Sequence, residues 1–194
     1  QNIESLAEMV RQGYSIVTPG PSCSYMLRQE YPQLVDSADA KLVAENTYDL
    51  SEFLMKLADR GKLQLEFPNK IGAVAYHLAC HLKAQNIGLR SRDLLRLIVG
   101  EGAEVEIAER CSAHDGTWAM KKEYFELSME WGGKLFRGLE RPEAETVASD
   151  CPLASMQIEK GIGKAPIHPI SLVAYAYGLR DKPGSSAQPT GSNA

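Results

Sequence analysis

The chain has 194 residues, of which 44% are hydrophobic and 24% are charged, and its formal net charge is −4. This size suits one globular domain, or one domain with a piece of another, and the apolar content is enough for a packed core. The mildly acidic balance excludes the strongly basic surface by which a domain binds nucleic acid.

In the first third of the chain, apolar periodicity predicts helices around one short strand. The strand covers residues 14–18 and contains β-branched side chains. Ser22 is the expected N-cap of the helix that follows, and Pro32 is expected to stop that helix. The predicted helices of this part cover residues 2–12, 23–30 and 37–60.

In the rest of the chain, short strands alternate with helices. This alternation predicts an α/β fold with a short, largely parallel sheet and flanking helices. Trp131 lies in the longest predicted helix and is expected to pack in the core. The predicted strands cover residues 71–76, 105–108 and 146–148, and the predicted helices cover residues 79–85, 91–99, 120–139, 152–160 and 169–177.

The ends and apolar runs of the chain bear on its location. The sequence begins with Gln1 and has no signal-peptide pattern, so we expect a processed, trimmed or partial chain. Its most apolar runs, residues 71–75 and 170–179, fall short of the roughly 18 residues that span a bilayer. Few, widely spaced cysteines are typical of a compartment that keeps thiols reduced. We therefore expect a cytoplasmic protein with at most peripheral contact at the inner face of the cell membrane.

The cysteines share one topological position. Each follows a short predicted strand, at the point where the chain turns toward a helix. Because the carboxyl ends of parallel strands meet at one edge of a sheet, such side chains can converge although they lie far apart in the sequence. Buried apolar cysteines are common, but four in one topological place favour a site. The four are Cys23, Cys80, Cys111 and Cys151.

Two histidines have spacings that suit metal ligands. They form the pairs His77-x-x-Cys80 and Cys111-x-x-His114. Read by themselves, these pairs would suit a zinc ion bound by two cysteines and two histidines. The alternative that His77 points into the core and His114 is an ordinary loop residue stays open.

Three short segments carry a resemblance to a known family. Residues 76–81 read YHLACH, residues 110–117 read RCSAHDGT and residues 149–154 read SDCPLA. They resemble the cysteine-rich (CCG) domain found in the B subunit of heterodisulfide reductase and its relatives, among them the iron–sulfur C subunit of anaerobic glycerol-3-phosphate dehydrogenase. The resemblance covers roughly residues 14–179.

The resemblance implies an iron–sulfur cluster bound by Cys80, Cys111 and Cys151. Two departures remove expected ligands, because the cysteine pair is reduced to Cys111-Ser112 and the closing Cys-x-x-Cys lacks its second cysteine. A cubane cluster normally takes four thiolates. The resemblance therefore implies either a 3Fe-4S cluster or a 4Fe-4S cluster with another ligand. The candidates for that ligand are His114, His81, Cys23 or a residue of a partner.

The resemblance also implies a domain plan and partners. Residues 1–34 would end a preceding cysteine-rich repeat, with Cys23 as the counterpart of Cys151. Residues 35–180 would form the second repeat, and residues 181–194 would be a disordered tail. The implied partners are a missing N-terminal half with a ferredoxin-like region, a flavin-containing dehydrogenase subunit and a quinone or other redox acceptor.

The expected function is that of a non-catalytic electron-transfer subunit of an oxidoreductase. One alternative is a catalytic subunit that reduces a disulfide or heterodisulfide. Another is a structural zinc-binding or metal-free interaction domain.

Overall fold

The computed structural model describes residues 1–114, 116 and 118–184. Their strands form two parallel sheets flanked by helices, which confirms the predicted α/β class. The larger sheet has the order β4-β3-β5, with β3 (Val74–His77) between β4 (Val105–Ala108) and β5 (Thr146–Ser149). The smaller one pairs β1 (Ile16–Thr18) with β2 (Thr47–Asp49).

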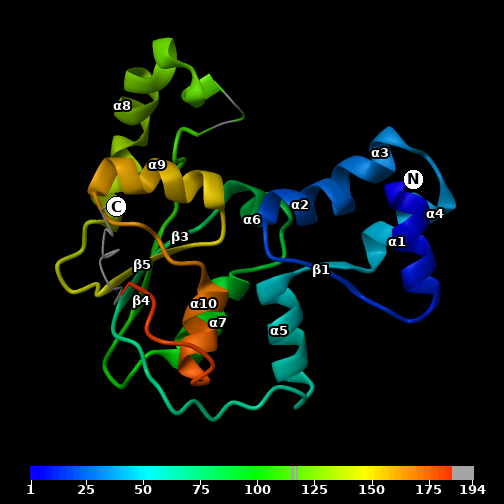
Figure 1. The fold of residues 1–194 in the computed structure, drawn as a ribbon, viewed down its shortest axis with the longest axis horizontal. Coiled ribbons are helices and arrows are strands. Elements are labelled where there is room, and N and C mark those ends of the chain that lie inside the picture. The colour runs from blue at the N-terminus through cyan, green and yellow to red at the C-terminus, as the bar shows by residue number, and fades with distance from the viewer. Residues whose placement is uncertain (115, 117, 185–194) are drawn as a thin grey trace, which may run out of the picture.

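Helices cover both faces of the larger sheet (Figure 1). Successive side chains of a strand point to opposite faces, and β3 follows this rule. Val74 and Tyr76 pack in a core with α7 (Arg90–Ile98) and α10 (Pro169–Ala176). Ala75 packs in a second core with α8 (Lys122–Leu139) and α9 (Pro152–Ile162). The sheet is therefore the middle layer of three, which leaves its carboxyl edge accessible.

The chain before β2 departs from prediction at two residues. The predicted helix at the start is α1 (Asn2–Arg11), but Gly20 rather than Ser22 is the N-cap of α2 (Pro21–Tyr25). Pro32 does not stop the next helix. A π-helical turn over Met26–Glu30 leads directly into α3 (Tyr31–Leu34), whose first turn holds Pro32. Pro32 has no N–H to donate, and it directly follows the altered, i to i−5 hydrogen bonding of the π-helical turn.

The single helix predicted over residues 37–60 is wrong. The structure has α4 (Ala38–Glu45), then β2, then α5 (Leu50–Asp59). A capping box starts α5: the Asp49 side chain accepts a hydrogen bond from the Ser51 N–H at 3.0 Å, and the Glu52 carboxylate accepts one from the Asp49 N–H. Apolar residues on both sides of this break gave one continuous helical pattern.

The second half of the chain follows the prediction closely. Residues 105–108 form β4 as predicted, and α6 (Cys80–Ala84) and η2 (Trp118–Met120) complete the elements. None of the helices in the described part is long and apolar enough to cross a membrane. The predicted disordered tail falls mostly on residues 185–194, which lie outside the described residues.

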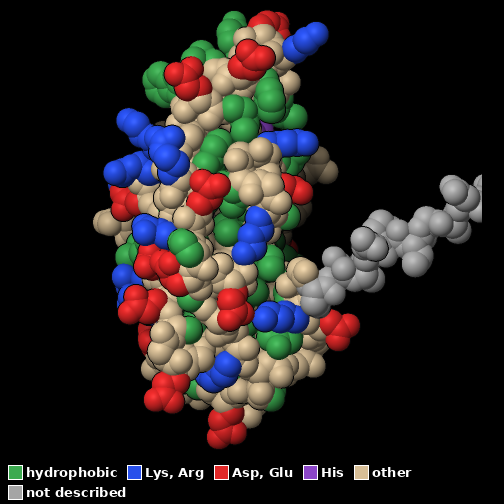
Figure 2. All heavy atoms as spheres, turned by 90° about the vertical axis from the view of Figure 1, so that its left-hand side faces the viewer, with side chains coloured by type: hydrophobic (Ala, Val, Ile, Leu, Met, Phe, Trp, Pro, Cys, Tyr) green, Lys and Arg blue, Asp and Glu red, His purple; other side chains and the backbone are tan. Residues whose placement is uncertain are grey.

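The core position predicted for Trp131 is wrong, because 71% of this residue is exposed on α8. Tyr124 and Leu127 of α8 are exposed as well, and their spacing continues one stripe along the helix, while Met120 of η2 is also exposed. Figure 2 shows hydrophobic side chains over the part of the surface where α8 lies, with charges of both signs among them. The stripe is thus an apolar surface feature and not part of the core.

Candidate functional site

The carboxyl ends of the three central strands lie level with one another. His77 of β3 pairs with Ala108 of β4 and with Ser149 of β5. A cysteine follows each strand end within three residues. One cavity of about 610 Å³ is lined by all three cysteines, which are Cys80, Cys111 and Cys151.

Local structure holds each thiol differently. Cys80 is the first residue of α6, and Cys151 is the N-cap of α9, where its Sγ accepts a hydrogen bond from the Ala154 N–H at 3.5 Å. Cys111 lies in the longer connection from β4 to η2, and its Sγ accepts from the Ala113 N–H at 3.2 Å. Two of the three sulfurs thus accept a backbone hydrogen bond.

The electrostatics of Cys80 reflect its place between the other two. Partial removal from water by the cavity walls raises the pKa of the Cys80 thiol, and the Cys151 and Cys111 thiols raise it further. The His81 N–H opposes this shift. Like charges disfavour one another, so three thiolates here require a compensating positive charge. A bound metal centre would supply it.

The turn after Cys111 has an unusual backbone. Ala113 has a φ of 61°, in the left-handed region that glycine prefers. The Ser112 Oγ accepts a hydrogen bond from the His114 N–H at 3.4 Å. Helix α8 approaches this turn closely at Gly132, where an added Cβ would lie 3.0 Å from the Ser112 carbonyl oxygen. The turn is therefore fixed from both sides.

Three histidines line the cavity, but their ring nitrogens differ. The Nδ1 of His77 lies 3.0 Å from the Ser149 Oγ, and burial lowers the pKa of His77 to about 4. The Nδ1 of His81 lies 2.9 Å from the Ser22 Oγ. The Nδ1 of His114 is buried and has no hydrogen-bond partner among the described residues.

A buried carboxyl group lies behind Cys151. The Asp150 side chain accepts hydrogen bonds from the Tyr76 hydroxyl at 2.6 Å and the Ser91 hydroxyl at 2.8 Å. Burial raises the pKa of Asp150, whereas these two hydroxyls lower it. Burial and the neighbouring Asp150 raise the pKa of Asp49 to about 7. Sequence reasoning missed Asp49 because it was placed inside a continuous helix.

The N-terminal part also reaches the cavity, but through Ser22 and not through Cys23, which the sequence offered as a ligand. Cys23 is exposed in α2 and is not among the lining residues, whereas Ser22 is. Tyr25 stacks on the His81 ring with 4.9 Å between centroids. Sequence reasoning missed Ser22 and Tyr25, although a polar residue after a Pro-Gly-Pro turn is a usable signal. An ion pair between Lys83 and Glu109 lies among the lining residues.

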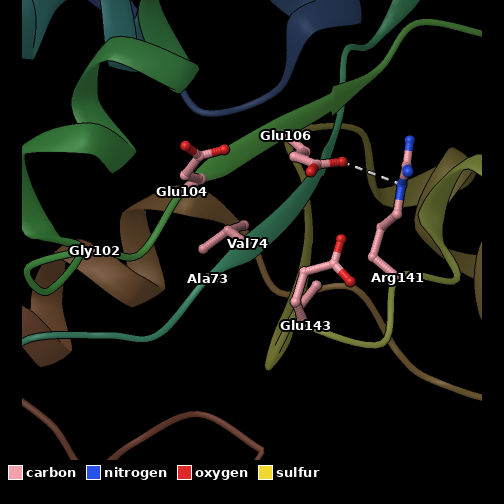
Figure 3. A pocket seen from close by; sticks show the side chains of 8 residues that line it. Ala73, Val74, Gly102, Glu104, Glu106, Arg141 and Glu143 are labelled. Carbon is pink, nitrogen blue, oxygen red and sulfur yellow. Dashed lines mark ion pairs between the residues drawn. The ribbon is translucent and has the colours of Figure 1, made fainter.

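A second cavity lies at the opposite edge of the sheet. It measures about 220 Å³ and is lined by residues at the start of β3 and around β4. In it, the Glu106 carboxylate faces Arg141, 3.2 Å from its Nε (Figure 3). Ligand sites of open α/β sheets gather at the carboxyl ends of strands, which favours the cysteine-lined cavity as the functional one.

The residues of the larger cavity include the ligand type that an iron–sulfur cluster uses. Within residues 1–114, 116 and 118–184, no group of three or more His, Cys, Asp or Glu side chains is arranged to hold one metal ion. The His77 ring, for which the sequence left a zinc ligand and a core residue open, is buried and lies 3.0 Å from the Ser149 Oγ. Three thiols, two with backbone donors, and a wide cavity fit an iron–sulfur cluster.

Comparison with known proteins agrees with this arrangement. Residues 74–159 match the cysteine-rich domain family CCG. The C subunit of anaerobic glycerol-3-phosphate dehydrogenase from Escherichia coli strain K12 is 32% identical over 176 residues, which are 90% of this chain and 44% of that protein. Lactate utilization protein A of Anoxybacillus flavithermus is 29% identical over 163 residues, which cover 76% of this chain and 64% of that protein.

The chain therefore spans less than two-thirds of the length of these relatives. The matched segment begins at the first residue of β3 and ends in α9, so it contains the three strands and all three cysteines of the cavity. This confirms the family predicted from the cysteine motifs. Residues 74–159 are a cysteine-rich domain of the CCG family, in a chain homologous to part of the C subunit of anaerobic glycerol-3-phosphate dehydrogenase.

Proposed function

We propose that this chain binds an iron–sulfur cluster through Cys80, Cys111 and Cys151 and transfers electrons within an oxidoreductase complex. The observation that carries the proposal is that three adjacent parallel strands deliver one cysteine each to a single cavity. Such convergence requires the whole sheet and is not expected of cysteines that merely fill a core.

The chain contributes binding and tuning. A bound cluster supplies one-electron redox chemistry, which belongs to the cofactor. The three thiolates hold it, and the N–H groups of Ala113 and Ala154 hydrogen-bond to two of the sulfurs. Hydrogen bonds to sulfur and restricted solvent access both change the reduction potential of a cluster.

We also propose redox partners for this chain. We infer that the electron donor is a flavin-containing dehydrogenase subunit and that the acceptor is a quinone or another redox centre. The homology to one component of a dehydrogenase supports this inference. The exposed stripe on α8 lies on the same side of the sheet as α9, and it offers an apolar contact surface for such a partner. We place the complex in the cytoplasm or at the inner face of the cell membrane.

The first test is the metal content of the anaerobically purified chain. We expect iron and sulfide with a cluster signal in electron paramagnetic resonance. Cys111→Ser should lose most of the iron, sulfide and visible absorbance, because it removes one of three thiolates. Cys23→Ser is the matched control and should retain them, since Cys23 does not line the cavity. Zinc without iron, or an unchanged cluster in Cys111→Ser, would overturn the assignment.

A second measurement separates transfer from disulfide catalysis. The reduced chain is mixed anaerobically either with a quinone or with a disulfide substrate, and reoxidation of the cluster is followed by its absorbance. Reoxidation by the quinone alone supports electron transfer between partners. Stoichiometric conversion of the disulfide to thiols would instead favour the catalytic alternative.

A further inference from the structure

We propose that the Nδ1 of His114 is the fourth ligand of the cluster, so that an imidazole occupies the corner left by three cysteines. The proposal rests on the proposed function and adds to it. Imidazole binds iron well, and histidine replaces cysteine at some iron–sulfur centres.

The three cavity histidines differ in whether their Nδ1 atoms have a hydrogen-bond partner. The Nδ1 of His77 is paired with the Ser149 hydroxyl, and that of His81 with the Ser22 hydroxyl. The Nδ1 of His114 is buried and has no partner in the described part of the chain. A buried ring nitrogen without a hydrogen bond costs free energy, and a metal ligand bond would compensate that cost.

The second step is position. His114 lines the same cavity as the three cysteines, three residues after Cys111. The left-handed conformation of Ala113 lies between them, and non-glycine residues in that region cluster at binding sites. Ser112 is a poor substitute ligand, because it is 9% exposed and its Oγ already accepts a hydrogen bond from the His114 N–H.

The third step is charge. A neutral imidazole adds no negative charge beside the three thiolates, whereas a fourth thiolate would. A cluster with three thiolates and one imidazole is one charge less negative than a cluster with four thiolates. Since a less negative cluster accepts an electron more readily, its reduction potential is higher.

The experiment uses pulsed electron paramagnetic resonance of the chain in its paramagnetic state, with and without ¹⁵N-labelled histidine. We expect a strong coupling from a directly bound histidine nitrogen in the wild-type chain. His114→Cys should keep iron and sulfide, lose this coupling and lower the reduction potential. His81→Ala is the control, because His81 lines the same cavity, and it should keep the coupling.

The outcomes separate this proposal from the function on which it rests. A wild-type cluster with normal iron and sulfide but without a bound nitrogen overturns the role of His114 and leaves the proposed function intact. Coupling that persists in His114→Cys and disappears in His81→Ala assigns the ligand to His81 instead. A folded wild-type chain that binds no iron or sulfide contradicts both proposals.

Discussion

Ala113 holds a backbone conformation that its own side chain disfavours. Its φ of 61° lies where the Cβ of an L-residue approaches the following carbonyl oxygen, at a cost of roughly 1–2 kcal/mol. Among the described residues other than glycine, only Asn86 shares a positive φ, and asparagine tolerates it better. The turn between Cys111 and His114 is therefore held by its surroundings against a local preference.

We predict that Ala113→Gly raises the free energy of unfolding by about 0.5–1 kcal/mol, because glycine adopts this φ without strain. The greater conformational entropy of glycine in the unfolded chain offsets only part of this stabilisation. Urea unfolding of the anaerobically purified chain measures it. Ala176→Gly, at a buried position in α10, is the control and should lower the stability by about 1 kcal/mol. A less stable Ala113→Gly would contradict the strain assigned to this turn.

Helix α8 positions the turn that carries Cys111. A Cβ added at Gly132 would lie 2.6 Å from the Phe136 Cζ and 3.0 Å from the Ser112 carbonyl oxygen. At the neighbouring Gly133 it would meet only the end of the Arg137 side chain, at 3.4 Å. Two adjacent glycines of one helix thus have different structural roles.

We predict that Gly132→Ala destabilises the chain by about 1–3 kcal/mol, as expected for overpacking, and reduces cluster occupancy by displacing the 111–114 turn. Gly133→Ala is the matched control and should raise stability by up to about 1 kcal/mol, because alanine favours a helix more than glycine does. Thermal unfolding and iron analysis of the two variants check this. Equal effects of the two substitutions would show that α8 does not constrain the turn.

Element prediction succeeded where a strand or helix carried its own signal. Residues 105–108 form β4 because a short β-branched run stands between glycine and charged residues. Strand β2 was missed because it has three residues and joins two amphipathic helices without a glycine or proline. The Asp49 and Glu52 capping box was the local signal that marked its end.

The candidate site was predictable only in part. Cys80, Cys111 and Cys151 converge because each follows the end of a strand and because the strands pair in parallel. Both features can be expected from the sequence. Long-range contacts decide which cavity histidine has an Nδ1 without a hydrogen-bond partner. One such contact joins Ser22 and His81, which are 59 residues apart in the sequence. The sequence pattern carries no information on such contacts.

Each sheet has a buried carboxyl group at the carboxyl end of one strand, and the two groups interact electrostatically. Asp49 ends β2, Asp150 follows β5, and each is at most 2% exposed. His168 joins the same region, since its Nδ1 accepts a hydrogen bond from the Ile170 N–H and its Nε2 lies 2.8 Å from the Pro19 carbonyl oxygen. The protonation state of Asp49 therefore bears on the stability of this region.

We predict that the contribution of Asp49 to the free energy of unfolding falls as pH rises from about 4 to 7. Asp49 has its pKa raised from the ordinary 3.8 to about 7, so in this range the folded chain binds a proton that the unfolded chain has released. Its contribution is fully present below pH 3.8 and is lost through pH 7. The shift corresponds to an upper bound of about 4 kcal/mol.

Asp49→Asn should remove this dependence while keeping the N-cap, because asparagine caps helices as well as aspartate does. In urea unfolding at several pH values, the free energy of unfolding of Asp49→Asn should increase relative to that of the wild type as pH rises from about 4 to 7, and the variant should be the more stable above pH 7. Asp59→Asn, on the exposed end of α5, should keep the wild-type profile. Parallel profiles for Asp49→Asn and the wild type would refute the assignment.

The placement of β3 at the centre of the sheet has a consequence for synthesis on the ribosome. The cavity needs β5, and Cys151 is translated 71 residues after Cys80. At about 5–20 residues per second, the Cys80 thiol is made roughly 4–14 s before its last partner. During that interval the nascent chain has unpaired thiols and no completed pocket, so early cysteines are open to oxidation or to the wrong metal. Cluster delivery must therefore wait until the last strand has been translated and has docked.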